Sequence, residues 1–458
     1  MNKKLQKIYK NARNERDPWM RRWDECAKFS APETYDDAAI LYDATAADAV
    51  DMLAANMFSL LTPPESLWLS LERTTEFSPD PVVAENALRA HLNDSNFYTT
   101  IHQCYLDLCV LGTACLLFSE TPLLSQSAFR FSAVPMRDIA IVRDNAGNAE
   151  HIFHTSAIAA DEIAERYPDW TPPAALRDKI TANPDTVLPL VQCVSETSDS
   201  TWDFCAWIDC GGEFENNIVA TGKFETCPYL IFRWSAASGE AYGRSPVMRA
   251  LPDIKTANKV VELVLKNATI AVSGIWQADD DGVINLSNIN LTPGAIIPKA
   301  VGSSGLTPLK SGADFDVSQL ILSDLRARIR HALLADRLSV LTDKTMTATE
   351  IIARNTDMMR ILGATYGRLL SELIKPLAAR GLCILARRGI IDPIILHRDA
   401  DLKYLAPISQ LAADERVTQI LSWLSAAGNA GMAESINAPA VMDYLAGALH
   451  IPAELINE

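Results

Sequence analysis

The sequence predicts an α+β protein that is mainly helical, and two patterns lead to this prediction. In segments such as 45–61, 254–268 and 322–333, apolar residues recur at spacings of three and four, the period of an amphipathic helix. Between residues 129 and 234, shorter runs alternate apolar and polar side chains and are separated by turn sequences, which is typical of antiparallel strands. We therefore expect a sheet framed by helices, followed by a largely helical second half.

The composition limits the possible functions. The 458 residues suffice for two or three domains, and 41 Lys and Arg residues against 57 Asp and Glu residues give a net charge of −16. General binding of nucleic acid is not expected unless basic residues gather locally. No apolar run approaches the roughly 20 residues that span a bilayer, and no signal peptide is expected. Nine cysteines without a Cys-x-x-Cys pair indicate free thiols in a reducing compartment.

Periodicity and Pro or Gly stops define the elements expected in the first half of the chain. They are helices at 1–30, 45–61 and 159–167, one or two helices within 86–117, a strand at 68–71, strands at 129–141, 150–155 and across 186–234, a turn at 144–147 and a hairpin at 210–213. Together they predict a meander-like sheet with helices around it.

The rest of the chain is organised around residues 242–350. Ser245 can cap a helix whose first turn holds Pro246, and Pro252 predicts that this helix is short and restarts or kinks there. The apolar stripe of the first helix consists of Ile254, Ala257, Val261, Val264 and Ala268, and that of a second helix consists of Leu322, Leu325, Ile329 and Leu333. Between them, the Gly- and Pro-rich residues 273–316 predict small strands joined by turns. The predicted layout is a two-helix stalk with a β tip.

A single long helix is expected behind this stalk. Thr347 and Glu350 have the spacing of a capping box, and an apolar face continues to about Arg388, where Gly389 can end the helix. At about 1.5 Å per residue this helix would be about 60 Å long, with a bend at Pro376. Residues 409–458 predict a small helical tail.

Catalytic and metal-binding patterns are absent from the sequence, so we expect neither an enzyme nor a cofactor. There is no phosphate-binding Gly-x-x-x-x-Gly-Lys-Ser/Thr loop. The run Asp279-Asp280-Asp281 fails as an EF-hand because Val283 stands where an oxygen ligand is required, and an acidic turn explains it. His151 and His154 are expected on opposite faces of one strand, which makes them poor partners for zinc.

Several short motifs resemble a known family when they are taken in order along the chain. They are Trp23 before Ala31-Pro32, Tyr42-Asp43-Ala44-Thr45, Leu60-Leu61-Thr62-Pro63-Pro64 before Trp68, Phe232-Arg233-Trp234, Tyr242-Gly243-Arg244-Ser245-Pro246 leading into Asp253-Ile254-Lys255, and Met346-Thr347-Ala348-Thr349-Glu350. Together these resemble the head-to-tail connector, or portal protein, of short-tailed bacteriophages. The resemblance extends over nearly the whole chain.

The resemblance implies a dodecameric ring at one capsid vertex of the virion, assembled in the host cytoplasm. A separate terminase motor would drive double-stranded DNA through the ring, and capsid, scaffolding and tail adaptor proteins would be further partners. The implied regions are an N-terminal α+β wing (1–244), a stem helix (245–272), a clip (273–316), a second stem helix (317–338), a channel loop (339–347), a long wing helix (348–400) and a helical crown (401–458).

The candidate site residues lie in the stalk and its loops. Arg326, Arg330 and Arg337 share one helix face, which fits either salt bridges to Asp324, Asp336 or a neighbouring subunit, or a ring of guanidinium groups facing the channel. The resemblance places Lys344 in the channel loop with Ser339, Thr342, Asp343 and Thr345, and it places Asp279, Asp280 and Asp281 at the motor-facing clip. Alternative functions are a tail adaptor or scaffold protein, or a metal-dependent nuclease at the acidic run.

Overall fold

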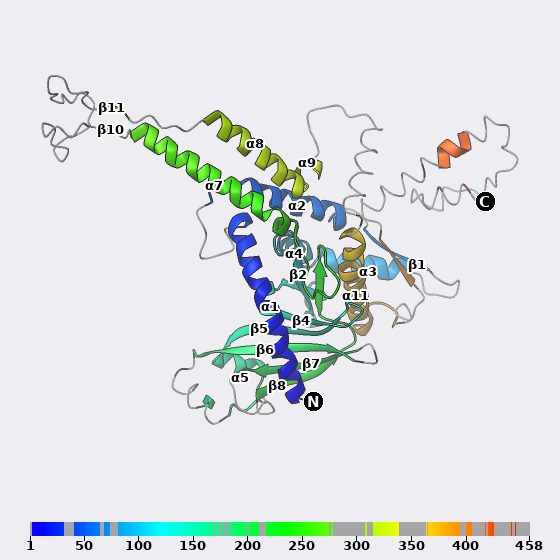
Figure 1. The fold of residues 1–458 in the computed structure, drawn as a ribbon. Coiled ribbons are helices and arrows are strands. Elements are labelled where there is room, and N and C mark those ends of the chain that lie inside the picture. The colour runs from blue at the N-terminus through cyan, green and yellow to red at the C-terminus, as the bar shows by residue number, and fades with distance from the viewer. Residues whose placement is uncertain are drawn as a thin grey trace, which may run out of the picture.

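The computed structural model shows a body of helices and sheets from which a pair of helices projects (Figure 1). It describes residues 2–31, 41–64, 68–73, 81–168, most of 170–209, 217–273, 276–277, 307–308, 315–338, 365–393 and 400–404, together with positions 363, 417, 420–425, 441 and 445. Within these residues the prediction of a mainly helical α+β fold is confirmed.

The elements keep the labels of Figure 1. The helices are α1 (Asn2–Ser30), α2 (Thr45–Leu61), α3 (Pro81–Asn93), α4 (Phe97–Leu111), the single turn η2 (Met136–Asp138), α5 (Ala160–Arg166), α7 (Pro246–Ser273), α8 (Phe315–Ala332), α9 (Ala335–Leu338), the π-helical turn η5 (Leu370–Ile374) and α11 (Lys375–Arg387). The strands are β1 (Leu69–Arg73), β2 (Thr113–Glu120), β3 (Phe129–Ala133), β4 (Ile139–Arg143), β5 (Ala149–Ala159), β6 (Val187–Glu196), β7 (Trp202–Ile208), β8 (Ile218–Phe224), β9 (Tyr229–Arg233), β10 (Trp276–Gln277), β11 (Thr307–Pro308) and β12 (Ala400–Tyr404).

The largest sheet has five antiparallel strands in the sequential order β4-β5-β6-β7-β8, the predicted meander. Successive side chains of a strand point to opposite faces, and a helix covers each face. Tyr9 and Ala12 of α1 pack on one face, against a cluster that includes Val191 and Trp207. Ile163 of α5 packs in a separate cluster with Leu190 and Ile208, the neighbours of those two residues along their strands. The expected hairpin turn at 210–213 lies outside the described residues, but β7 and β8 pair as antiparallel neighbours.

The main core lies above this sheet, where α1, α2, α4 and the three-stranded sheet β3-β2-β9 meet the base of α7. Trp23 and Tyr242 are buried there with their rings 5.2 Å apart and nearly perpendicular. The eight described cysteines are free thiols. Burial raises the pKa of Cys26 to about 12, so this thiol stays protonated and unreactive at neutral pH. Among the described residues, no helix is both long and apolar enough to cross a membrane.

The expected helix within 86–117 is shorter than predicted, because α4 ends at Leu111 and β2 begins at Thr113. The change occurs at Gly112, whose φ of 81° lies in the left-handed region that glycine adopts most readily. The apolar run after it, which resembles a buried helix, is the central and mostly buried strand of a three-stranded sheet.

The expected restart at Pro252 is wrong, because α7 runs without interruption from Pro246 to Ser273. Val247 and Ala250 before the proline and Ile254 and Ala257 after it are all buried in the main core. Packing of the residues before and after Pro252 therefore keeps the helix continuous, although a proline in a helix interior is unfavourable.

The second stem helix, expected over 317–338, is divided into α8 and α9 at Leu333 and Leu334. Leu334 has a φ of 60°, and its N–H donates to the His331 carbonyl. Leu333 and Ala335 are both buried, and residues two apart cannot share one helix face. The turn between the helices reorients the chain so that both side chains reach the core.

The long helix is described without gaps only from residue 365 onward. Its π-helical turn η5 ends two residues before Pro376, which lacks an N–H and would clash with the carbonyl of residue 372 in a regular α-helix. The helix ends as predicted at Gly389, with a φ of 70° and with hydrogen bonds from Gly389 N–H to Ala386 and from Ile390 N–H to Leu385. The capping pair Thr347 and Glu350 lies outside the described residues.

The resemblance implies a wing helix up to residue 400 and a helical crown from residue 401, but the structure has a strand at this boundary. Residues 400–404 form β12, which pairs antiparallel with β1 near the start of the sequence. Neither strand is stable alone, because each needs the other for its backbone hydrogen bonds.

Candidate functional site: the stem and its anchor

Helices α7 and α8 lie side by side (Figure 1), and we refer to this pair as the stem. At the end near the body, Ile254 and Ala257 of α7 and Ile329 of α8 are at most 2% exposed. Farther out, the apolar stripe of α7 is only half-buried. Among the described side chains of the stem, four large apolar ones are exposed: Leu263 by 48%, Leu265 by 50%, Leu320 by 72% and Ile321 by 48%. A single copy therefore leaves the outer stem with an uncovered apolar surface.

The stem begins where the sequence predicts. Ser245 is buried, and its Oγ accepts the Met248 N–H at 2.9 Å, as a helix cap with Pro246 in the first turn. On the charged side of α7, Glu262 pairs with Lys259 and Lys266 at 3.0 and 2.5 Å. The tip also begins as predicted, because β10 and β11 form an antiparallel pair beyond the stem helices.

A buried carboxylate, Asp43, anchors the stem to the body. Its Oδ2 lies 2.8 Å from the Nε of Arg326 on α8, and its Oδ1 accepts the Thr45 N–H at the start of α2. The side chain is only 3% exposed. Asn258 of α7 accepts the N–H groups of Tyr42 and Asp43, at 2.7 and 3.1 Å. One short segment thus connects α2 to both stem helices.

The electrostatics of this anchor favour a charged Asp43. Burial alone would raise the pKa of the carboxyl group. The hydrogen bonds from Thr45 and the charge and hydrogen bond of Arg326 outweigh burial, so the pKa is lowered from its ordinary value. The anchor is therefore an ion pair at neutral pH.

The three arginines that the sequence groups on one helix face have different surroundings in the structure. Arg326 forms a salt bridge with Asp43, and no ion pair among the described residues joins it to Asp324 or Asp336. Asp336 instead lies 3.3 Å from His331. Arg330 is exposed, and no hydrogen bond or ion pair joins it to another described residue. Arg337 belongs to α9, with its side chain outside the described set.

The other predicted site residues lie outside the described residues. They are Ser339, Thr342, Asp343, Lys344 and Thr345 of the loop and Asp279, Asp280 and Asp281 of the tip. Within the described chain, no group of three or more His, Cys, Asp or Glu side chains could hold a metal ion. His151 and His154 contact different partners, Ser195 and Tyr229.

The turn that leads into the stem is packed directly against the end of α4. Gly243 N–H donates to Thr113 Oγ1 at 2.7 Å, and Trp234 N–H donates to the Gly112 carbonyl at 3.0 Å. A Cβ atom on Gly112 would lie 2.5 Å from the backbone nitrogen of Ser245. Only glycine at position 112 permits this approach.

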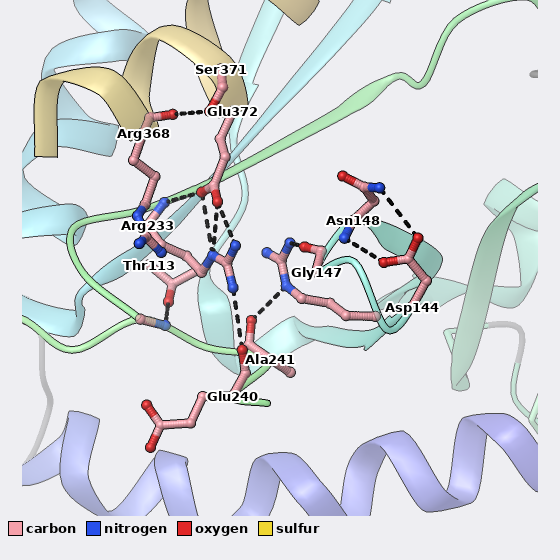
Figure 2. A network of polar contacts seen from close by, with 12 residues as sticks. Thr113, Asp144, Gly147, Asn148, Arg233, Glu240, Ala241, Arg368, Ser371 and Glu372 are labelled. Carbon is pink, nitrogen blue, oxygen red and sulfur yellow. Dashed lines mark hydrogen bonds and ion pairs between the residues drawn. The ribbon is translucent and has the colours of Figure 1, made fainter. Parts of the chain in front are cut away.

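Figure 2 shows a second anchor, between β9 and the long helix. Arg233 donates from Nε and Nη2 to Glu372 Oε1, at 3.1 and 2.5 Å, and its backbone N–H donates to Oε2 at 2.9 Å. Its Nη1 donates to the Glu240 carbonyl in the turn before the stem. Both charged side chains are largely buried, 9% and 16% exposed. Glu372 lies within η5, so this ion pair ties the π-helical turn to the sheet.

Arg143 completes the network by donating to the carbonyls of Ala241 and Gly147, each at 2.8 Å (Figure 2). Burial, followed by the nearby charge of Arg233, lowers the pKa of Arg143 to about 10, so it stays protonated at neutral pH. In the sequence, Arg233 and Asp43 are recognisable only as parts of motifs, and their ion pairs are not predicted. Sequence reasoning missed Asn258 and Glu372 altogether, because each looks like an ordinary helix residue.

Comparison with known proteins identifies the family. A family model described as bacteriophage head to tail connecting protein matches residues 2–456. The chain belongs to this family. The chain is 24% identical over 467 residues to a probable portal protein of Bordetella phage BPP-1, covering 94% of this chain and 82% of that protein. It is 21% and 20% identical to the portal proteins of Enterobacteria phage T3 and Escherichia phage T7, in each case covering 81% of this chain and 72% of the relative.

Two matching solved structures come from gene transfer agent particles. A virion of the native particle matches with a TM-score of 0.40 and 12% identity, covering 89% of both chains. The neck of the native particle, computed with C12 symmetry, matches with a TM-score of 0.38 and 13% identity, covering 82% of this chain and 85% of that one. The function of the connector is to join head and tail in a bacteriophage virion, as the sequence resemblance implied.

Proposed function

We propose that the connector forms a closed ring, a dodecamer, through which double-stranded DNA enters the head and leaves it. The observation that carries this proposal is the uncovered apolar surface of the outer stem, with Leu320 at 72% exposed. Exposed apolar surface of this kind marks an interaction site, and a ring of identical copies covers it with neighbouring stems. In this proposal the protein acts structurally and not as an enzyme.

The assembly test compares two exposed leucines. Leu320→Asp places a charge in the proposed stem contact and should shift the purified protein from rings to single subunits, measured by light scattering. Leu123→Asp is the matched control, because Leu123 is 77% exposed in the turn between β2 and β3, away from the stem. Equal assembly of the two variants would contradict a contact through the stem.

The contacts with DNA in this proposal are few. A channel through which DNA slides should not hold phosphate tightly, because each retained contact adds salt-dependent affinity. Asp43 already neutralises Arg326, whereas Arg330 is exposed and lacks a partner among the described residues. We assign the channel-facing role to Arg330 and propose Arg337 and Lys344 as further positions. The ring contacts DNA without reading its sequence.

The remaining partners are assigned by analogy with the family. The clip, with Asp279, Asp280 and Asp281, would face the terminase motor, and capsid, scaffolding and tail adaptor proteins would bind elsewhere during assembly in the host cytoplasm. Deleting residues 279–290 should leave soluble protein that no longer supports DNA packaging.

A further inference from the structure

The two helices that cover the five-stranded sheet carry opposite charge on their outer sides. The first four turns of α1 cross one face of the sheet, and Figure 1 shows this helix in front of the strands. The exposed residues Lys4, Lys7, Lys10 and Arg13 lie along these turns. Residues 2–14 contain no Asp or Glu, although the whole chain has a net charge of −16. We call these four cations the basic face of α1.

The opposite face of the sheet is covered by α5, whose charge is mainly acidic. Ile163 is buried against the strands, and Asp161, Glu162 and Glu165 are exposed. The one cation of this helix, Arg166, lies 5.8 Å from the ring centre of Tyr167. We call the three carboxylates the acidic face of α5.

The two charged faces cannot meet within one copy, because the sheet separates them. Val191 and Trp207 belong to the cluster beneath α1, whereas Leu190 and Ile208 belong to the cluster beneath α5. Among the described residues, no ion pair involves Lys4, Lys7 or Lys10, and none involves the acidic face. The helix over one face of the sheet is therefore basic and the helix over the other face is mainly acidic, and no ion pair among the described residues neutralises the carboxylates of α5 or these three lysines.

We propose that the basic face of α1 binds the acidic face of α5 of the next copy in the ring. Opposite charges on opposite sides suit a head-to-tail contact, because each copy then offers the complement of what its neighbour presents. A two-fold contact would place like charges together. This inference rests on the ring of the proposed function. It adds which surfaces of adjacent copies meet, because α1 of each copy contacts α5 of the next copy. The contact is exposed, so it should weaken as salt screens it.

A charge swap tests this contact in the full-length chain. One variant carries Lys4→Glu, Lys7→Glu and Lys10→Glu, and a second carries Asp161→Lys, Glu162→Lys and Glu165→Lys. Each should raise the concentration needed for half-assembly by about tenfold or more at low salt, and the difference from wild type should fade at high salt. The combined variant restores the wild-type net charge and should restore assembly. Circular dichroism and thermal unfolding confirm that each variant folds.

The contrary outcomes are distinct. Rings that are unaffected by either triple substitution, or a combined variant that assembles no better than the single-sided ones, would overturn this contact alone. If the α1 variant assembled normally but bound double-stranded DNA more weakly, the basic face would meet DNA and the proposal would be wrong. A wild-type chain that stayed monomeric would overturn both this contact and the proposed ring.

Discussion

The Nε of Arg326 lies 2.8 Å from Oδ2 of Asp43, a residue 283 positions earlier in the chain. This pair joins the segment before α2 to the second stem helix. Asn258 holds the same segment against the first stem helix. The segment before α2 therefore contributes to the attachment of both stem helices to the body, beside the apolar packing at their base.

The Asp43 anchor predicts a pH-dependent stability difference. Asp43→Asn should lower the free energy of unfolding by about 2 kcal/mol at neutral pH, less than for a fully buried pair because Arg326 is 39% exposed. Because the folded-state pKa is lowered, the stabilisation is full above the unfolded pKa of about 3.9 and is lost as the pH falls through the folded value. Urea unfolding of both proteins between pH 7 and pH 3 measures this.

The control for this experiment is Asp48→Asn, which removes an exposed carboxylate from the first turn of α2. Its effect should stay within about 0.5 kcal/mol at every pH. If the Asp43 variant lost no more stability than this control, the anchor would have no energetic role.

Arg233 and Glu372 should be strongly coupled. Arg233→Ala leaves a buried carboxylate without its partner and should cost about 3–5 kcal/mol. The nearby Arg244→Ala breaks an exposed pair with Glu240 and should cost less than about 1 kcal/mol. A double-mutant cycle with Glu372→Gln measures the coupling. Additive losses in this cycle would show that the contacts in Figure 2 do not hold η5 in place.

Substitutions at two glycines with positive φ distinguish the cost of backbone strain from the cost of steric crowding. Gly112→Ala combines a φ of 81° with a Cβ 2.5 Å from the Ser245 nitrogen, and should cost about 3 kcal/mol or more or prevent folding. Gly147→Ala has a φ of 89° but nothing within 4 Å of the new Cβ, and should cost about 1 kcal/mol. Soluble yield and thermal unfolding compare them. Similar losses would argue against tight packing between α4 and the turn before the stem.

The loop at 339–347 is predicted to act as a gasket on DNA by its shape and not by its charge, since Asp343 offsets Lys344. Lys344→Ala should leave packaging largely intact, whereas deleting residues 342–345 should preserve ring assembly and reduce the DNA retained in filled heads. Retention equal to wild type in the deletion, or loss of packaging by Lys344→Ala alone, would refute this role.

Local patterns predicted most of the elements. The stripe that includes Ile254 and Ala257 marks α7, the Ser245 cap marks its start, and Gly389 marks the end of α11. The failures have a common cause in distant packing. The core keeps α7 continuous past Pro252, and β12 is a strand because β1 is available to pair with it.

The candidate site was less predictable than the fold. Periodicity put Arg326 and Arg330 on one helix face, but it could not show that Arg326 forms an ion pair with Asp43. The partner of Arg233 is equally invisible in the sequence, because Glu372 is 139 positions away. Spacing along a helix reveals which residues share a face and does not reveal what that face meets.

The molar mass of the purified chain, measured by light scattering together with end-on electron micrographs, tests the central claim most directly. A subunit of 50.2 kDa should assemble at micromolar concentration into rings of about twelve copies with a central opening. A well-behaved monomer under these conditions, or an open chain of copies without a channel, would contradict the account.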